Sequence, residues 1–125
     1  MDKLEYISGD LVFHYIPKTT IKKYVKVYVC STNNALSLED MDGNLYDYIG
    51  VLYPIPLTPE ILEKNEWKKL YEKFFEKNVN NIRLTIEFSE NIYVAINRIF
   101  IMEIHYIHEL QHLLFGLGLN SEMEV

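Results

Sequence analysis

The sequence has little cysteine and no long apolar run. Cys30 is the only cysteine, so an intramolecular disulfide is excluded and a reducing compartment is favoured. The longest apolar stretches are short and interrupted by charged residues, which predicts that the chain does not span a membrane. The first residues show no apolar run after a basic start, so no signal peptide is expected. We therefore expect a cytoplasmic protein.

Basic residues are also in deficit. The chain has twelve Lys and Arg residues and eighteen Asp and Glu residues, which gives a formal net charge of −6. This negative charge argues against general binding to nucleic acids. The chain contains no glycine-rich phosphate loop and no serine in a nucleophile-elbow pattern. The length of 125 residues, with 49% hydrophobic and 24% charged residues, is typical of one globular domain.

The first half of the chain predicts a small twisted antiparallel sheet or a partial barrel. Four segments have the composition or alternation of short strands and are bounded by turn residues. They are residues 10–16, 21–29, 35–38 and 45–52. Pro54 and Pro56 then force an extended segment. This segment marks a seam, within a single domain of residues 1–125, between a β-rich lobe (about 1–53) and an α+β lobe (about 54–125).

The second half predicts a short helix, a second small sheet and a C-terminal amphipathic helix. Thr58, Pro59 and Glu60 are typical of a helix start. Residues 67–77 fit helical spacing, with a strand carrying aromatic residues on both faces as the alternative. Strands are expected at 82–88 and 92–96, with 100–104 extending the sheet, and the last helix at about 105–117. The predicted fold class is therefore α+β.

The last helix carries an HExxH pattern at residues 108–112. His108 and His112 are four residues apart, so both rings can reach one ion, and Glu109 lies beside them as a general base. His105 falls on the same side of the helix. These residues define one hypothesis, a zinc-dependent hydrolase with His108, His112 and His105 as ligands and Glu109 as the catalytic base.

Two observations weigh against this zinc site. A catalytic zinc usually needs a third protein ligand that approaches from another direction. After the HExxH pattern, the only carboxylate side chains in the sequence are those of Glu122 and Glu124. The apolar residues of the helix form a stripe opposite the histidines, which predicts that the histidines face solvent. The stripe consists of Ile104, Ile107, Leu110, Leu114 and Leu117. We therefore favour a protein without a cofactor that is not an enzyme, with a zinc-dependent enzyme as the alternative.

Two segments carry a resemblance to a known group of proteins. Residues 54–62, PIPLTPEIL, and residues 106–113, YIHELQHL, resemble the PIPLT segment and the YVHxLQ-type helix of small uncharacterised phage and prophage proteins of gut Bacteroidota. The resemblance implies a matching layout, with Gln common at position 109 and Asn at position 112, neither of which a zinc hydrolase tolerates. The resemblance implies no particular activity for this chain. The chain departs from the group at Glu66 and Trp67.

One strand face offers a second candidate site. Lys22, Tyr24, Lys26 and Tyr28 alternate with valines, so ammonium groups and rings share one face that can stack a base and neutralise a phosphate. Cross-strand pairing on an exposed face is the simpler interpretation. The leading hypothesis is a non-enzymatic accessory protein that binds a host protein or a nucleotide signal in the host cytoplasm, as an inhibitor of host defence. An oligomeric structural component is the third hypothesis.

Overall fold

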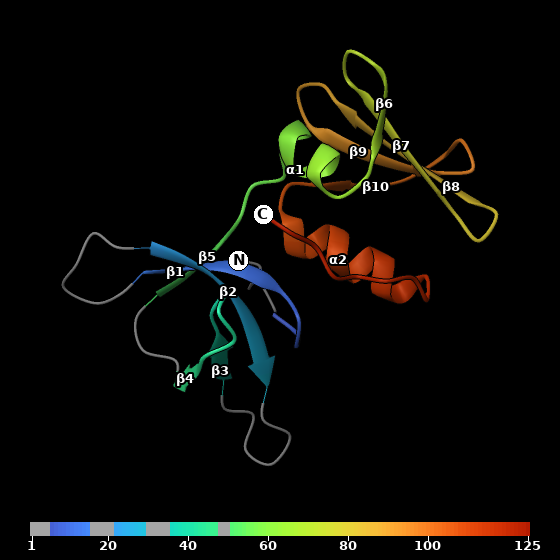
Figure 1. The fold of residues 1–125 in the computed structure, drawn as a ribbon. Helices are drawn as coiled ribbons and strands as arrows, with labels where there is room; N and C mark the ends of the chain where they lie inside the picture. Colours follow the sequence, from blue (N-terminus) through green and yellow to red (C-terminus); the bar gives the residue numbers. More distant parts are fainter. Residues whose placement is uncertain (1–5, 16–21, 30–35, 48–50) are drawn as a thin grey trace. The chain divides into compact units, whose positions relative to one another are not determined.

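The computed structural model describes residues 6–15, 22–29, 36–47 and 51–125. The chain divides into two compact units, Met1–Ile55 and Pro56–Val125, and the division falls within the proline segment. Each unit contains one small antiparallel sheet, and both helices belong to the second unit (Figure 1). The predicted α+β class, with two sheets, a short helix and a C-terminal helix, is confirmed. Within the described ranges, no helix is long and apolar enough to cross a membrane.

The first sheet has five antiparallel strands in the order β4-β3-β2-β1-β5. The strands are β1 (Leu11–Tyr15), β2 (Lys22–Val29), β3 (Leu36–Glu39), β4 (Leu45–Asp47) and β5 (Val51–Pro54). The single strand expected at 45–52 is instead two strands, because its two parts pair with different neighbours, β4 with β3 and β5 with β1. Pro54 lies in the edge strand β5, where a missing N–H group is tolerated.

The valines of β2 point to one face of the sheet and the residues between them to the other, as the alternation in the sequence predicted. Val25 and Val27 are fully buried, and they lie opposite Val12 of β1 and Leu38 of β3. These four residues form the core of the first unit, with Tyr6 and Leu52 packed against it. Because side chains alternate between the two faces of a strand, the residues between the valines lie on the opposite face.

The second sheet is a meander in the order β10-β9-β8-β7-β6. Its strands are β6 (Lys68–Tyr71), β7 (Phe74–Val79), β8 (Ile82–Phe88), β9 (Ile92–Ile96) and β10 (Ile99–Ile104). Two of its hairpins turn through pairs of residues with positive φ, Asn80–Asn81 and Asn97–Arg98, as two-residue hairpin loops require. The strands predicted at 82–88, 92–96 and 100–104 are confirmed.

Helix α1 (Pro59–Lys64) begins where the sequence predicts. Thr58 is the N-cap, and its Oγ1 accepts a hydrogen bond from the Ile61 N–H at 3.3 Å. Asn65 is the C-cap, and its side chain donates to the Ile61 carbonyl at 2.8 Å. Leu62 is the one fully buried residue of this short helix.

Of the two alternatives left open for residues 67–77, the structure has strands and not a helix, because the segment forms the β6–β7 hairpin. Trp67 and Phe75 are buried, as a core-facing helix would also place them, whereas Tyr71 is 73% exposed. Strand β7 pairs with β8 along its whole length, from Phe74 opposite Glu87 to Val79 opposite Ile82. The apolar spacing fits a helix locally, but pairing with β8 decides the structure.

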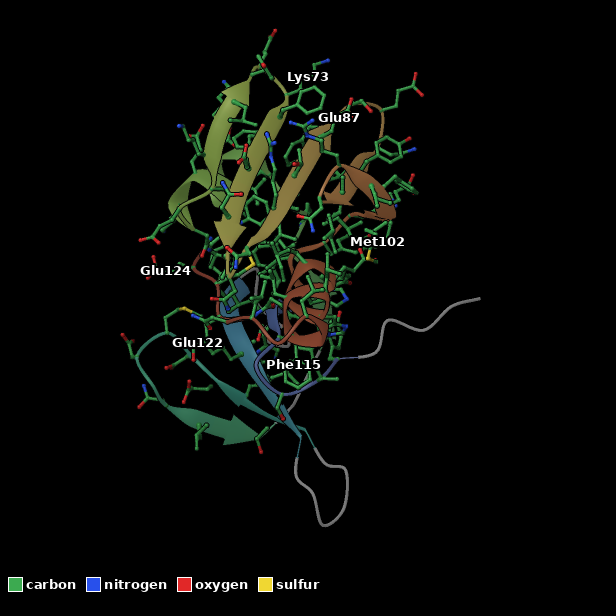
Figure 2. The ribbon with its side chains drawn as sticks, turned by 90° about the vertical axis from the view of Figure 1, so that its right-hand side faces the viewer. Lys73, Glu87, Met102, Phe115, Glu122 and Glu124 are labelled. Carbon is green, nitrogen blue, oxygen red and sulfur yellow. The ribbon has the colours of Figure 1, made fainter. Side chains whose placement is uncertain are left out.

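Helix α2 (Ile107–Gly116) is followed by a segment that forms hydrogen bonds with the rest of the second unit. The Leu119 N–H donates to the Leu114 carbonyl at 2.9 Å, and Gln111 Nε2 donates to the Ser121 carbonyl at 3.0 Å. Asn65 then bonds both the N–H and the carbonyl of Glu124, each at 2.8 Å. Figure 2 shows Glu122 and Glu124 on this returning segment. Residues 117–125 are therefore an ordered part of the second unit.

An ion pair joins strands β7 and β8 of the second sheet. Arg83 Nη2 is 3.0 Å from Glu76 Oε2, and Asn78 Nδ2 donates to Glu76 Oε1 at 2.6 Å. The Asn78 hydrogen bond, followed by the attraction of Arg83 and Lys68, lowers the pKa of the Glu76 carboxyl below its usual 4.5, although loss of hydration opposes the shift. The ionised form of Glu76 is therefore favoured by the fold.

This pKa gives a pH-dependent prediction. A carboxyl whose pKa is lower in the folded state stabilises the fold above its unfolded pKa, and this stabilisation is lost as the pH falls through the folded pKa. We expect Glu76→Gln to lower the free energy of unfolding at neutral pH, and the loss to shrink as the pH is taken below 4.5. Urea denaturation across this range measures it. Glu90→Gln removes the same charge from an exposed turn as a control, and an identical pH profile for the two variants would contradict the prediction.

Candidate functional site

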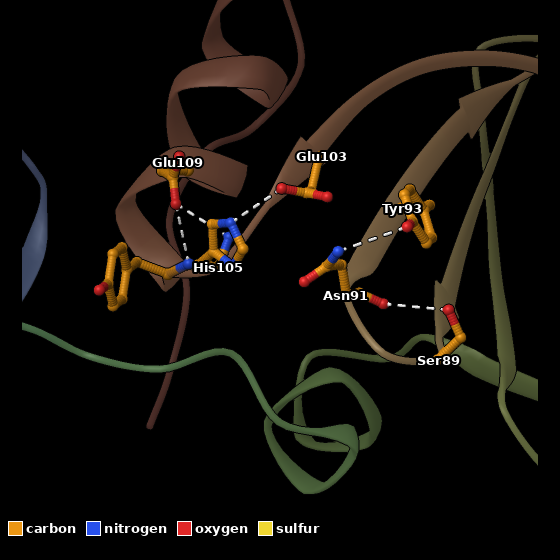
Figure 3. Close-up of polar contacts among 7 residues, drawn as sticks. Ser89, Asn91, Tyr93, Glu103, His105 and Glu109 are labelled. Carbon is orange, nitrogen blue, oxygen red and sulfur yellow. Dashed lines mark hydrogen bonds and ion pairs between the residues drawn. The ribbon is translucent and has the colours of Figure 1, made fainter.

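The HExxH glutamate lies at the N-terminus of α2 and caps it. Glu109 Oε1 accepts hydrogen bonds from the His105 N–H at 2.9 Å and from the Tyr106 N–H at 3.0 Å (Figure 3). Tyr106 occupies the N-cap position. Glu109 is the third residue of the helix, where a Glu or Gln reaches back to the N-cap backbone in a capping box. Its carboxylate is therefore engaged with the backbone.

The three histidines do not share one exposed helix face. His105 precedes α2 and is exposed, and its Nε2 lies 3.1 Å from Glu103 Oε2 (Figure 3). His108 is 2% exposed and His112 is half-buried. The prediction that the histidines face solvent is thus wrong for His108. The buried side of α2 is wider than the apolar stripe, and it includes Ile107, His108, Leu110, Gln111 and Leu114.

The spacing of four residues does keep two of the histidines adjacent. The ring centroids of His108 and His112 are 5.5 Å apart, and the rings are nearly perpendicular. The His108 ring also lies almost parallel to the Tyr106 ring, at 5.9 Å. Over the described residues, however, no group of three or more His, Cys, Asp or Glu side chains is placed to hold a metal ion. The zinc site stays a prediction, and the geometry of the described residues adds no third ligand to it.

The face of β2 that carries Tyr24 and Lys26 lies beside aromatic residues of other strands, which the sequence alone did not indicate. Phe13 of β1 lies directly opposite Tyr24 of β2 and, on its other side, opposite Tyr53 of β5. Directly opposed residues project from the same face of a sheet. The three rings therefore form a line across three neighbouring strands, which we call the aromatic row. Tyr24 is 39% exposed, Tyr53 is 48% exposed and Phe13 is half-buried.

Part of the predicted face falls outside the described side chains. Tyr24 and Lys26 are described, and they lie on one face because they are two residues apart in β2. The side chains of Lys22 and Tyr28 lie outside the described part of the structure. The rings of Tyr24 and Phe13 are stacked, with centroids 4.7 Å apart and planes 30° from parallel. Phe13 and Tyr53 were missed because only the pairing register brings them to Tyr24.

The position of Glu109 predicts a structural effect that separates a cap from a catalytic base. We expect Glu109→Ala to lower the free energy of unfolding by about 0.5–2 kcal/mol, because two backbone N–H groups lose their acceptor. Glu109→Gln should retain most of the stability, since glutamine also fills this position of a capping box. Chemical denaturation of the three proteins measures both effects.

A catalytic role would give a different result. A zinc hydrolase would lose its activity in Glu109→Gln, and it would contain stoichiometric zinc that His112→Asn removes. Elemental analysis of protein purified without a chelator provides this measurement. Zinc at one ion per chain, together with equal stability of the alanine and glutamine variants, would contradict the capping role.

Comparison with known proteins adds no assignment to this geometry. No family model matches the chain, and neither a curated protein nor a solved structure matches it. Two features remain as evidence about function. One is the aromatic row of the first sheet, and the other is the N-terminus of α2, where Glu109 is already engaged.

Proposed function

We propose that this chain is a non-enzymatic binding protein whose aromatic row, with Lys26 beside it, holds a flat anionic ligand of the nucleotide class. The observation that carries the proposal is the register of the first sheet, which lines up Tyr24, Phe13 and Tyr53. An exposed line of rings offers stacking surface for a planar base, and every base has such a surface. In this proposal, stacking of the ligand's ring is the main binding interaction, and attraction between opposite charges is the second.

Lys26 supplies the complementary charge. Residues two apart on one strand are roughly 7 Å from each other. This distance suits a ligand whose base stacks on Tyr24 while a phosphate approaches the Lys26 ammonium group. Lys26 lies opposite Glu39 of β3. A small nucleotide also fits the acidic chain better than a polynucleotide does, because it carries few phosphates.

The proposed setting is a phage-infected host cell. It follows from the resemblance of residues 54–62 and 106–113 to phage and prophage proteins, and the ligand would then be a nucleotide signal of host defence. A protein that sequesters such a signal needs a binding surface and no catalytic group. A host protein that binds the same aromatic row is the competing partner, and it becomes an outcome of the test.

Titration calorimetry with purified nucleotides tests the proposal. The probes are mononucleotides and cyclic dinucleotides, with ribose 5-phosphate as a probe that has the phosphate but no base. We expect a nucleotide to bind and ribose 5-phosphate not to bind. Tyr24→Ala and Tyr53→Ala should each weaken binding about fivefold or more, the lower end of what loss of one stacked ring costs. Lys26→Gln should weaken binding and reduce its dependence on salt.

Matched controls keep the result specific. Tyr53→Phe retains the ring and should bind like the natural protein, whereas Tyr71→Ala removes an exposed tyrosine from the other sheet and should change nothing. Binding that is insensitive to both Tyr24→Ala and Tyr53→Ala would refute the proposed site. No heat with any nucleotide, combined with capture of a host protein that Tyr24→Ala abolishes, would replace the nucleotide by a protein partner.

A further inference from the structure

A second line of side chains crosses the second sheet, and it alternates between rings and carboxylates. Glu87 of β8 lies directly opposite Phe74 of β7 on one side and Tyr93 of β9 on the other. Tyr93 in turn lies opposite Glu103 of β10. Neighbouring side chains in such a line are about 5 Å apart at their Cβ atoms. We call Phe74, Glu87, Tyr93 and Glu103 the acidic row.

The acidic row lies on the less buried face of its sheet. The residues that flank it along the strands, Phe75, Ile86 and Val94, are at most 1% exposed and point to the opposite face. Phe74, Glu87 and Tyr93 themselves are half-buried, and Glu103 is exposed. Part of each of these side chains is therefore within reach of a ligand.

Each of the two rings that flank Glu87 contacts a further aromatic ring. The Tyr71 ring meets the Phe74 ring edge to face at 6.1 Å, and the Phe100 ring meets the Tyr93 ring at 5.8 Å. Tyr71 is 73% exposed and Phe100 is 60% exposed. One carboxylate thus lies between two pairs of rings whose outer members are largely in solvent.

Among the described residues, the side chain of Glu87 has no hydrogen bond and no ion pair. Arg83, which lies on the same face of β8, is bound to Glu76 in the adjacent line. Lys73, at the same end of the sheet in Figure 2, forms no ion pair within the described part of the chain. Residues 56–125 contain eleven acidic and seven basic side chains, so the surroundings favour a cation.

We infer that the acidic row binds an arginine side chain of a partner protein. A guanidinium group can stack on the face of Tyr93 or Phe74 while its N–H groups pair with the Glu87 carboxylate. Lysine offers a point charge that cannot stack and pair in the same way. The inference concerns the second unit and does not depend on nucleotide binding by the first.

NMR titration with short peptides tests this inference. The probes are three blocked tripeptides, Gly-Arg-Gly, Gly-Lys-Gly and Gly-citrulline-Gly, added to the full chain at low salt. We expect the arginine peptide to shift the amide signals of Phe74, Glu87 and Tyr93, the lysine peptide to bind more weakly, and the uncharged citrulline peptide to leave them unchanged. Glu87→Gln should weaken arginine binding about fivefold, and Tyr93→Leu about two- to fivefold.

The controls separate a defined site from general attraction. Glu90→Gln removes one charge from the neighbouring exposed turn and should leave arginine binding unchanged. Tyr53→Leu removes a ring from the first sheet and should also have no effect. Equal shifts around all exposed carboxylates, equal weakening by Glu87→Gln and Glu90→Gln, or equal binding of the lysine and arginine peptides would overturn the inference. Folding of each variant is checked from its amide spectrum.

Discussion

The register between antiparallel strands is the constraint on which the rest of this structure depends. Phe13 reaches Tyr24 and Tyr53 only because β1 pairs with β2 and β5 at those positions. A slip of one residue would move every side chain of a strand to the other face. The burial of Val25 and Val27 fixes the register of β2, since the slipped strand would place lysine and tyrosine in the core. The hydrophobic core thus determines which side chains meet on the exposed face.

Local chemistry in the sequence predicted those parts of the fold that local chemistry controls. The alternation in β2 and the N-cap Thr58 each act within a few residues. Residues 67–77 could not be predicted in this way, because helical spacing and a hairpin both satisfy the positions of Trp67 and Phe75. Only the partner strand β8 distinguishes them, and it comes later in the chain.

The HExxH pattern shows how one carboxylate can satisfy two different sequence motifs. The pattern places Glu109 beside two histidines, and it also places it third in a helix that begins at Ile107. At the start of α2 the carboxylate fills the capping position, because the N–H groups of His105 and Tyr106 need an acceptor there. A capping role tolerates glutamine at this position. A zinc hydrolase would not.

The same physical principle gives the two sheets opposite expected ligands. In both sheets aromatic rings on an exposed face supply stacking area that is indifferent to charge. In the first sheet the neighbouring line contains Lys26, whose charge is the reason for proposing an anion, whereas in the second sheet Glu87 lies between the rings and is the reason for proposing a cation. Under these two proposals the charged residue beside the rings, and not the rings themselves, distinguishes the two ligands. Exchanging charges between these two positions is consequently expected to exchange the preferences, while the hydrophobic cores beneath both sheets stay as they are.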